Sequence, residues 1–185
     1  MVLVNSQATC GIDTAAEVVE TIKAAGGNAV AHVGSVTEEG FAEAFIQTGV
    51  DAFGGVDIIV NNAGYTWDAM IGKMSDKQFD AIMDVHVKAP FRILRAASNV
   101  FIPAAKAEAA EGKVTYRKVV NISSVAGLGG NAGQANYSSA KAAILGMTKT
   151  LSKEWGRYNV NVNCVAFGFI TTRLTEGADE KKKLT

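Results

Sequence analysis

The sequence predicts an α/β fold: a doubly wound parallel sheet in three layers, with helices on both faces. Three observations lead to this prediction. Strand-like and helix-like patterns alternate along the whole chain, as in successive strand–helix–strand units. The run "VDIIVNN" (56–62) is mostly apolar, which is typical of a strand buried on both faces of a parallel sheet. The hydrophobic content of 48% and the net charge of zero indicate one folded domain, residues 1–185.

The first part of the chain supplies three strands and two helices. Strands are expected over 1–5, 28–34 and 56–62, where short apolar runs lie between glycines and polar residues. Amphipathic helices are expected over 13–27 and 37–55, and each of them ends at a pair of glycines. This order of elements places a helix between each strand and the next.

The second part begins with a long helix. Ser75 and Gln78 have the spacing of a capping box, which predicts the start of this helix. Pro90 is expected to kink or divide it, because proline removes a helical hydrogen bond. The remaining predicted elements are a polar surface extension (106–117), a buried strand (117–123), a long helix (136–157) and a last strand (160–166).

Composition excludes several classes of function. Eighteen basic and eighteen acidic residues balance, so the chain lacks the positive charge of a nucleic-acid binder. Cys10 and Cys164 have no metal-ligand spacing and cannot form a disulfide framework, so we expect reduced thiols and no metal site. No apolar stretch approaches the roughly 20 residues that span a bilayer, and the first residues lack a signal-peptide pattern. We therefore expect a cytoplasmic protein without nucleic-acid or membrane partners.

Tyr137 and Lys141 lie one helical turn apart, and Ser124 precedes them at the end of a predicted strand. Residues at this spacing share a helix face. A neighbouring ammonium favours the phenolate, which predicts a tyrosine pKa below its ordinary value of about 10. Together these groups can hold a carbonyl and exchange a proton with it, while a nicotinamide cofactor would supply the hydride. Taken alone, the Tyr-x-x-x-Lys pair also occurs on the surface of many helices.

The stretch from Ser124 to Lys141 resembles the short-chain dehydrogenase/reductase family. That family has a serine after a central strand and then Tyr-x-x-x-Lys, which Ser124, Tyr137 and Lys141 match. "NNAG" (61–64) and "FGFITT" (167–172) are similar to its cofactor-side signature and its Pro-Gly loop. "DVHVKAPF" and "GGNAGQANYSSAK" look closest to 3-oxoacyl-[acyl-carrier-protein] reductases and 3-hydroxyacyl-CoA dehydrogenase domains. The similarity runs over nearly the whole chain.

This resemblance implies a Rossmann-like fold and a role for each matching residue. Tyr137 would donate the proton, Lys141 would lower its pKa and anchor the nicotinamide ribose, and Ser124 would hold the carbonyl oxygen. His86 stands where many relatives have an asparagine that helps to organise a water-linked proton path; it could serve catalysis in the same way or be a buried structural histidine. The substrate would be a carbonyl or alcohol, carried as an acyl-CoA or on an acyl-carrier protein, and a homodimer or homotetramer would form through the long helices. The implied cofactor-binding residues are Ser35, Asn62, Ala63, Gly64, Tyr137, Lys141, Gly168, Ile170 and Thr172.

The chain also departs from the family pattern. The strand, glycine-rich loop and helix with which members begin have no counterpart, and the C-terminal end is short, so we expect a fold that is incomplete at both ends. "GLGGNAG" (127–133) fits a relaxed phosphate-loop pattern, but it lies between Ser124 and Tyr137, and Glu154 would fall inside a helix. Ser6 replaces the acidic residue of NAD-preferring members, which leaves NAD and NADP open. The alternative hypothesis is a truncated fragment or pseudo-enzyme retained for subunit assembly.

Overall fold

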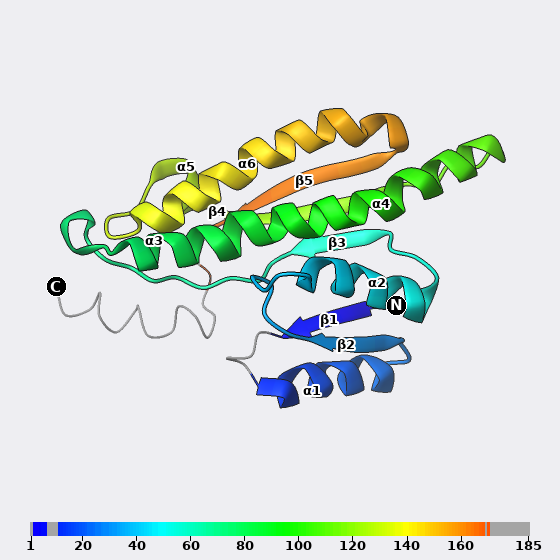
Figure 1. The fold of residues 1–185 in the computed structure, drawn as a ribbon, viewed down its shortest axis with the longest axis horizontal. Coiled ribbons are helices and arrows are strands. Elements are labelled where there is room, and N and C mark those ends of the chain that lie inside the picture. The colour runs from blue at the N-terminus through cyan, green and yellow to red at the C-terminus, as the bar shows by residue number, and fades with distance from the viewer. Residues whose placement is uncertain (1, 7–10, 169, 171–185) are drawn as a thin grey trace.

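The computed structural model describes residues 2–6, 11–168 and 170, and for residues 2–6 and 11–14 it describes only the course of the backbone. Strands and helices alternate and every described strand pair is parallel, so the predicted fold class is confirmed (Figure 1). The elements are β1 (Val2–Ser6), α1 (Gly11–Ala24), β2 (Ala29–Val33), α2 (Phe41–Phe53), β3 (Ile58–Asn61), α3 (Asp76–Met83), α4 (Ala89–Ala110), β4 (Arg117–Ser124), α5 (Val125–Gly129), α6 (Ala135–Trp155) and β5 (Val160–Phe167).

The described strands form two sheets. One contains β1 and β2, and the other has the order β3-β4-β5. In Figure 1, β1 is drawn between β2 and β3, but its only described strand partner is β2. Strand β3 therefore pairs with β4 along one edge and leaves its other edge without a described strand.

A groove runs along β3. It has a volume of about 1030 Å³ and is walled by β3 together with side chains of α2 and α4. Within β3, Ile59 is buried, whereas Ile58 and Val60 on the opposite face are 60% and 57% exposed. Apolar side chains and a strand edge without a described partner therefore occur together at this place, which is a pattern that promotes association of chains.

The long helix is divided before Pro90. Ser75 caps α3 as predicted: its hydroxyl accepts from the Gln78 N–H at 3.3 Å, and the Gln78 side chain accepts from the Ser75 N–H at 3.0 Å. A π-helical turn, Asp84–Lys88, then joins α3 to α4. Pro90 lies in the first turn of α4, where the missing N–H is tolerated. The division therefore comes from the wider turn ahead of the proline.

Helix α4 also extends further than predicted. It continues to Ala110 and contains Pro103, so residues 106–110, the first part of the predicted surface extension, belong to the helix. The segment consists largely of alanine, lysine and glutamate, which are strong helix formers, and this propensity outweighed its polar character. None of the helices among the described residues is long and apolar enough to cross a membrane.

The core lies between the three-stranded sheet and helices α4 and α6. Phe101 of α4 meets Trp155 of α6 edge to face at 6.1 Å between ring centroids. Asn121 of β4 is fully buried, and both of its side-chain groups are bonded. It accepts from Asn61 Nδ2 at 2.8 Å and donates to Thr148 Oγ1 at 2.9 Å. These bonds fix β4 against β3 and α6 without an unsatisfied amide in the core.

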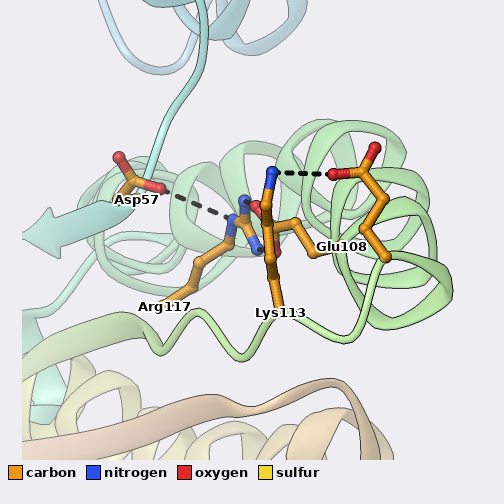
Figure 2. Close-up of polar contacts among 5 residues, drawn as sticks. Asp57, Glu108, Lys113 and Arg117 are labelled. Carbon is orange, nitrogen blue, oxygen red and sulfur yellow. Dashed lines mark hydrogen bonds and ion pairs between the residues drawn. The ribbon is translucent and has the colours of Figure 1, made fainter.

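Arg117 anchors the start of β4 (Figure 2). Its guanidinium is buried and donates two hydrogen bonds to the Glu108 carboxylate, at 2.9 and 2.8 Å. Asp57 lies 3.6 Å from Nε. The guanidinium holds the pKa of Glu108 below its ordinary value, chiefly through these hydrogen bonds. The first residue of the strand is thereby tied to the end of α4.

Candidate active site

The predicted catalytic residues come from three elements that meet beyond the carboxyl end of β4. Ser124 ends β4 and caps the short helix α5, where its hydroxyl accepts from the Ala126 N–H at 3.2 Å. Tyr137 and Lys141 lie on the first turns of α6. His86 comes from the π-helical turn between α3 and α4. All four line one cavity of about 590 Å³, here called the site cavity.

Lys141 is buried and its ammonium is held in place. Its Nζ donates to the carbonyl oxygen of Ile122 at 2.7 Å and lies 5.5 Å from the centre of the Tyr137 ring. Burial lowers the pKa of Lys141 to about 8. A Cβ on Gly127 would lie 2.7 Å from the backbone of Lys141, so only glycine lets α5 approach α6 this closely. Lys141 can still present its remaining N–H donors to the site cavity.

Tyr137 differs from the expectation. The sequence predicted that Lys141 lowers the tyrosine pKa, but burial raises the pKa of Tyr137 above its ordinary value, while a hydrogen bond with the Ser124 side chain acts in the opposite direction. The Lys141 ammonium faces the ring and is bonded to the Ile122 carbonyl, whereas the charge that acts on the phenol is that of Asp68, which raises the pKa further. At neutral pH the phenol is therefore protonated and can act as a proton donor.

His86 is a neutral imidazole that packs against Tyr137. The two rings meet edge to face, with centroids 5.2 Å apart and planes at 87°. Burial, followed by the charge of Lys141, lowers the pKa of His86 to about 4. The Tyr65 carbonyl can only accept, so Nε2 carries the proton and donates to it at 2.7 Å. This tautomer leaves Nδ1 as an acceptor.

The packing of His86 against Gly64 explains why residue 64 is a glycine. A Cβ at this position would overlap the imidazole ring, so the contact requires glycine. Family resemblance had placed Gly64 beside a cofactor, and it does line the site cavity. Nothing in the sequence indicates that it also touches His86, because the two residues belong to different elements.

The predicted cofactor-binding residues are distributed over the site cavity and the groove. Asn62 lines both hollows, so it stands where they meet. Ala63 lines the groove. Ser35 lines neither; it follows β2, and its hydroxyl is bonded to that of Thr37 at 2.9 Å. Thr172 lies outside the described residues. The remaining predicted residues line the site cavity: Gly64, Tyr137, Lys141, Gly168 and Ile170.

These residues fit a nicotinamide cofactor on chemical grounds. An ammonium and a phenol hydroxyl face the same cavity, and a ribose diol can bond to both of them. The cavity volume lies within the range of small-ligand sites, about 300 to 1,000 Å³. The alternative phosphate loop at 127–133 does not fit, because Gly127 packs on the backbone of Lys141 and Glu154 lies within α6.

Asn136 is a structural contributor that the sequence analysis did not single out. Its side chain is fully buried, accepts from the Tyr137 N–H at 2.8 Å and donates to the carbonyls of Trp67 and Gln78 at 3.0 and 3.2 Å. It thus holds the start of α6 to α3 and to the loop that follows β3. The described residues contain no group of three or more metal-ligating side chains.

A carbonyl held by Ser124 and Tyr137 can take a proton from the phenol while a hydride reaches its carbon. The fold and this site define a class of enzyme, the nicotinamide-dependent oxidoreductases. The family model for short chain dehydrogenases matches residues 4–183, and the chain belongs to that family.

Two curated relatives illustrate the similarity. The chain is 41% identical over 159 residues to the peroxisomal hydratase-dehydrogenase-epimerase of Saccharomyces cerevisiae, covering 86% of this chain and 16% of the relative. It is 40% identical over 164 residues to a 3-oxoacyl-[acyl-carrier-protein] reductase of Synechocystis, covering 88% and 62%. The chain therefore spans less than two thirds of the length of these relatives.

Solved structures agree with the assignment. A short chain dehydrogenase from Mycobacterium avium is 43% identical, with a TM-score of 0.77, and the match covers 87% of this chain and 53% of that one. A gluconate 5-dehydrogenase from Burkholderia cenocepacia, solved in complex with NADP and tartrate, is 25% identical with a TM-score of 0.81. That match covers 95% of this chain and 64% of the other.

Proposed function

We propose that this chain interconverts a 3-oxoacyl thioester and the corresponding 3-hydroxyacyl thioester with NAD or NADP. The observation that carries the proposal is the meeting of Ser124, Tyr137 and Lys141 in one cavity, with the phenol protonated at neutral pH. The substrate class is supported by the names of relatives that are about 40% identical, among them the 3-oxoacyl-[acyl-carrier-protein] reductases.

Each residue then has a defined part in the reduction. The hydroxyls of Ser124 and Tyr137 donate to the carbonyl oxygen and polarise it. A nicotinamide cofactor held here would supply the hydride that the carbonyl carbon requires, and the Tyr137 phenol gives its proton to the carbonyl oxygen, which yields the alcohol. Negative charge develops on the phenol oxygen at this point, and the nearby Lys141 ammonium stabilises it. Because the Lys141 pKa is about 8, this charge is present at neutral pH.

His86 acts in this scheme as a positioning residue. Its Nε2–H holds the Tyr65 carbonyl, and its ring supports one side of the Tyr137 ring. Neutrality matters, because an imidazolium at this place would lie close to the positive charge of Lys141. The low pKa of His86 keeps the ring uncharged across the physiological range.

Cofactor choice, assembly and location complete the proposal. NADP is bound in the Burkholderia cenocepacia neighbour, and either nicotinamide dinucleotide is a candidate here. Helices α4 and α6 are the expected contacts of a homodimer or homotetramer. A cytoplasmic location remains the prediction, although two relatives are peroxisomal by name. The non-catalytic alternative is favoured by one observation, the open groove beside β3, where an assembly partner would have an apolar edge to cover.

The test is turnover of acetoacetyl-coenzyme A by the purified chain, with NADH and NADPH in separate assays that follow nicotinamide absorbance. Tyr137→Phe is the inactive comparison, and Tyr116→Phe, at an exposed tyrosine outside the site cavity, is the matched control. Turnover that Tyr116→Phe keeps and Tyr137→Phe loses supports the proposal. Saturable cofactor binding without turnover of any acyl thioester would favour the non-catalytic alternative.

A further inference from the structure

Four large apolar side chains are exposed in segments that adjoin the lining of the site cavity. They are Trp67, Met70 and Ile71 in the loop after β3 and Leu128 in α5, and they are exposed by 40%, 63%, 77% and 64%. We call this set the apolar rim. A single exposed apolar residue needs no explanation. A group of them beside a cavity is typical of a surface that binds an apolar ligand.

The loop that carries most of the rim is fastened to the start of α6. The Ala69 N–H donates to the Gly133 carbonyl at 2.9 Å, and Gln134 Nε2 donates to the Asp68 carboxylate at 2.9 Å. Asn136 Nδ2 donates to the Trp67 carbonyl at 3.0 Å. These bonds fasten residues 67 to 69 to the start of α6, and the Lys73 N–H donates to the Met70 carbonyl at 2.8 Å, so the exposed side chains of Trp67, Met70 and Ile71 belong to a segment whose backbone is hydrogen-bonded.

The rim is continuous with the residues that line the site cavity. Tyr65 and Thr66 line the cavity and directly precede Trp67. Ala126 and Gly130 line it on either side of Leu128. In Figure 1 the loop after β3 and helix α5 lie at the same end of the molecule, where the strands end. A substrate whose reacting carbon lies at Tyr137 can therefore extend outward onto apolar side chains.

The character of the rim selects a hydrocarbon among the possible extensions. Two charged groups adjoin the four apolar side chains: the Asp68 carboxylate is bonded to the Gln134 side chain, and Lys73 is exposed two residues beyond Ile71. A sugar or polyol would leave its hydroxyls against apolar side chains without partners. An alkyl tail would instead remove both itself and the rim from water.

We propose that the apolar rim binds the acyl tail of the substrate and gives the enzyme a preference for medium and long chains over short ones. This inference rests on the proposed function, because it places a 3-oxoacyl or 3-hydroxyacyl thioester at Tyr137. The tail leaves the site cavity past Thr66 and lies over Trp67, Met70 and Ile71, with Leu128 on the other side. Each methylene withdrawn from water strengthens binding by a factor of up to about 4.

The first experiment measures binding directly through Trp67 fluorescence. The chain has two tryptophans, and Trp155 is buried in the core, so a ligand-induced blue shift reports on Trp67. We expect 3-hydroxydecanoyl-coenzyme A to shift the emission and to bind at least about tenfold more tightly than 3-hydroxybutanoyl-coenzyme A. Trp67→Phe should abolish the shift. Equal affinity for the two ligands, or no shift with the long one, would overturn the proposal.

The second experiment separates the rim from the catalytic groups. The double variant Met70→Ser/Ile71→Ser should lose the preference for the decanoyl ligand and keep its affinity for the butanoyl one. Val114→Ser/Tyr116→Ser removes two similarly exposed apolar side chains before β4 and should retain the preference. A preference that survives in the first variant, or is lost equally in both, would contradict a role of the rim.

Failure of the proposed reaction can be distinguished from failure of the apolar rim to bind acyl tails. In that case the wild-type chain turns over neither the decanoyl nor the butanoyl thioester with NAD or NADP. The ratio of their affinities and the response of Trp67 still decide whether the rim binds acyl tails. Conversely, Tyr137-dependent turnover of both substrates with equal kcat/KM would support the reaction and reject the rim.

Discussion

Strands β3 and β4 are neighbours in one sheet, yet their surroundings differ. Strand β4 pairs with a strand on each side, and its buried polar side chain Asn121 is bonded to both β3 and α6. Strand β3 has one described partner, and Ile58 and Val60 face the outside. Ser124, a proposed catalytic residue, ends the enclosed strand β4. Asn62, a proposed cofactor-binding residue, follows β3, the strand with one described partner.

The two strands should therefore respond differently to amino-acid substitutions. Tyr137, Lys141 and Ser124 are held by β4, α5 and α6, which are tightly packed on one another. Asn62 and Ala63 depend on β3 and face the groove. We therefore expect changes near β4 to affect the chemical step and changes along β3 to affect surface properties.

The first prediction concerns Tyr137→Phe. It removes the hydroxyl that we propose as the proton donor and leaves the ring, so we expect kcat to fall by about 10²- to 10⁴-fold, the usual contribution of a positioned acid. Steady-state kinetics on acetoacetyl-coenzyme A would measure this, and a thermal melt would check that the fold persists. Activity within a few-fold of wild type would show that another group supplies the proton. The assignment of the chemical step to the residues near β4 would then be wrong.

The second prediction concerns the contact between Gly64 and His86. Gly64→Ala introduces a methyl group that overlaps the imidazole, so His86 must move and Tyr137 loses its support. We expect about a 10²-fold loss of kcat/KM, as for other small displacements of catalytic groups. The control is Gly129→Ala, because a Cβ at Gly129 meets no atom within 4 Å.

A double variant decides whether the loss has this cause. In Gly64→Ala/His86→Ala the imidazole is gone and the methyl group has room, so the double variant should be less impaired than the sum of the single effects predicts. Strict additivity of the two effects on kcat/KM would show that Gly64 matters for another reason, such as contact with the cofactor.

The third prediction concerns pH. The His86 pKa is about 4 in the folded chain and 6.5 in the unfolded one. Between these values the unfolded chain binds more protons, so the free energy of unfolding falls as the pH drops from 6.5 to 4, by roughly 3 kcal/mol at most from this group. Denaturant unfolding at several pH values would show the decline. His86→Asn should flatten it over that interval, and an unchanged decline would assign it to the carboxylates.

Much of the fold was accessible from the sequence, because alternating patterns and glycine pairs mark local structure. The capping box at Ser75 was confirmed in both of its hydrogen bonds. The helical spacing that joins Tyr137 to Lys141 is also local, and helix geometry alone places both on one face. These features depend on neighbours in the chain, which a sequence displays directly.

The features that escaped prediction depend on distant parts of the chain. The separation of the strands into two sheets is a matter of which strands meet, and the patterns of single strands do not encode it. The contact between Gly64 and His86 joins two elements. The direction of the Tyr137 pKa shift follows from burial, which outweighs the hydrogen bond with Ser124, and burial is known only once α6 has packed.

The smallest expected effect belongs to the open edge of β3. Val60→Thr keeps the β-branched shape and places a hydroxyl on a side chain that is already exposed, so the free energy of unfolding should change by less than about 0.5 kcal/mol. Binding of a fluorescent apolar dye and concentration-dependent light scattering should nevertheless decrease, because the groove loses part of its apolar wall. Val114→Thr is the matched control, since Val114 is similarly exposed but lies away from the groove. If both variants lower dye binding equally, the groove binds apolar dye no more strongly than the rest of the surface. The contrast between β3 and β4 would then have no consequence for association.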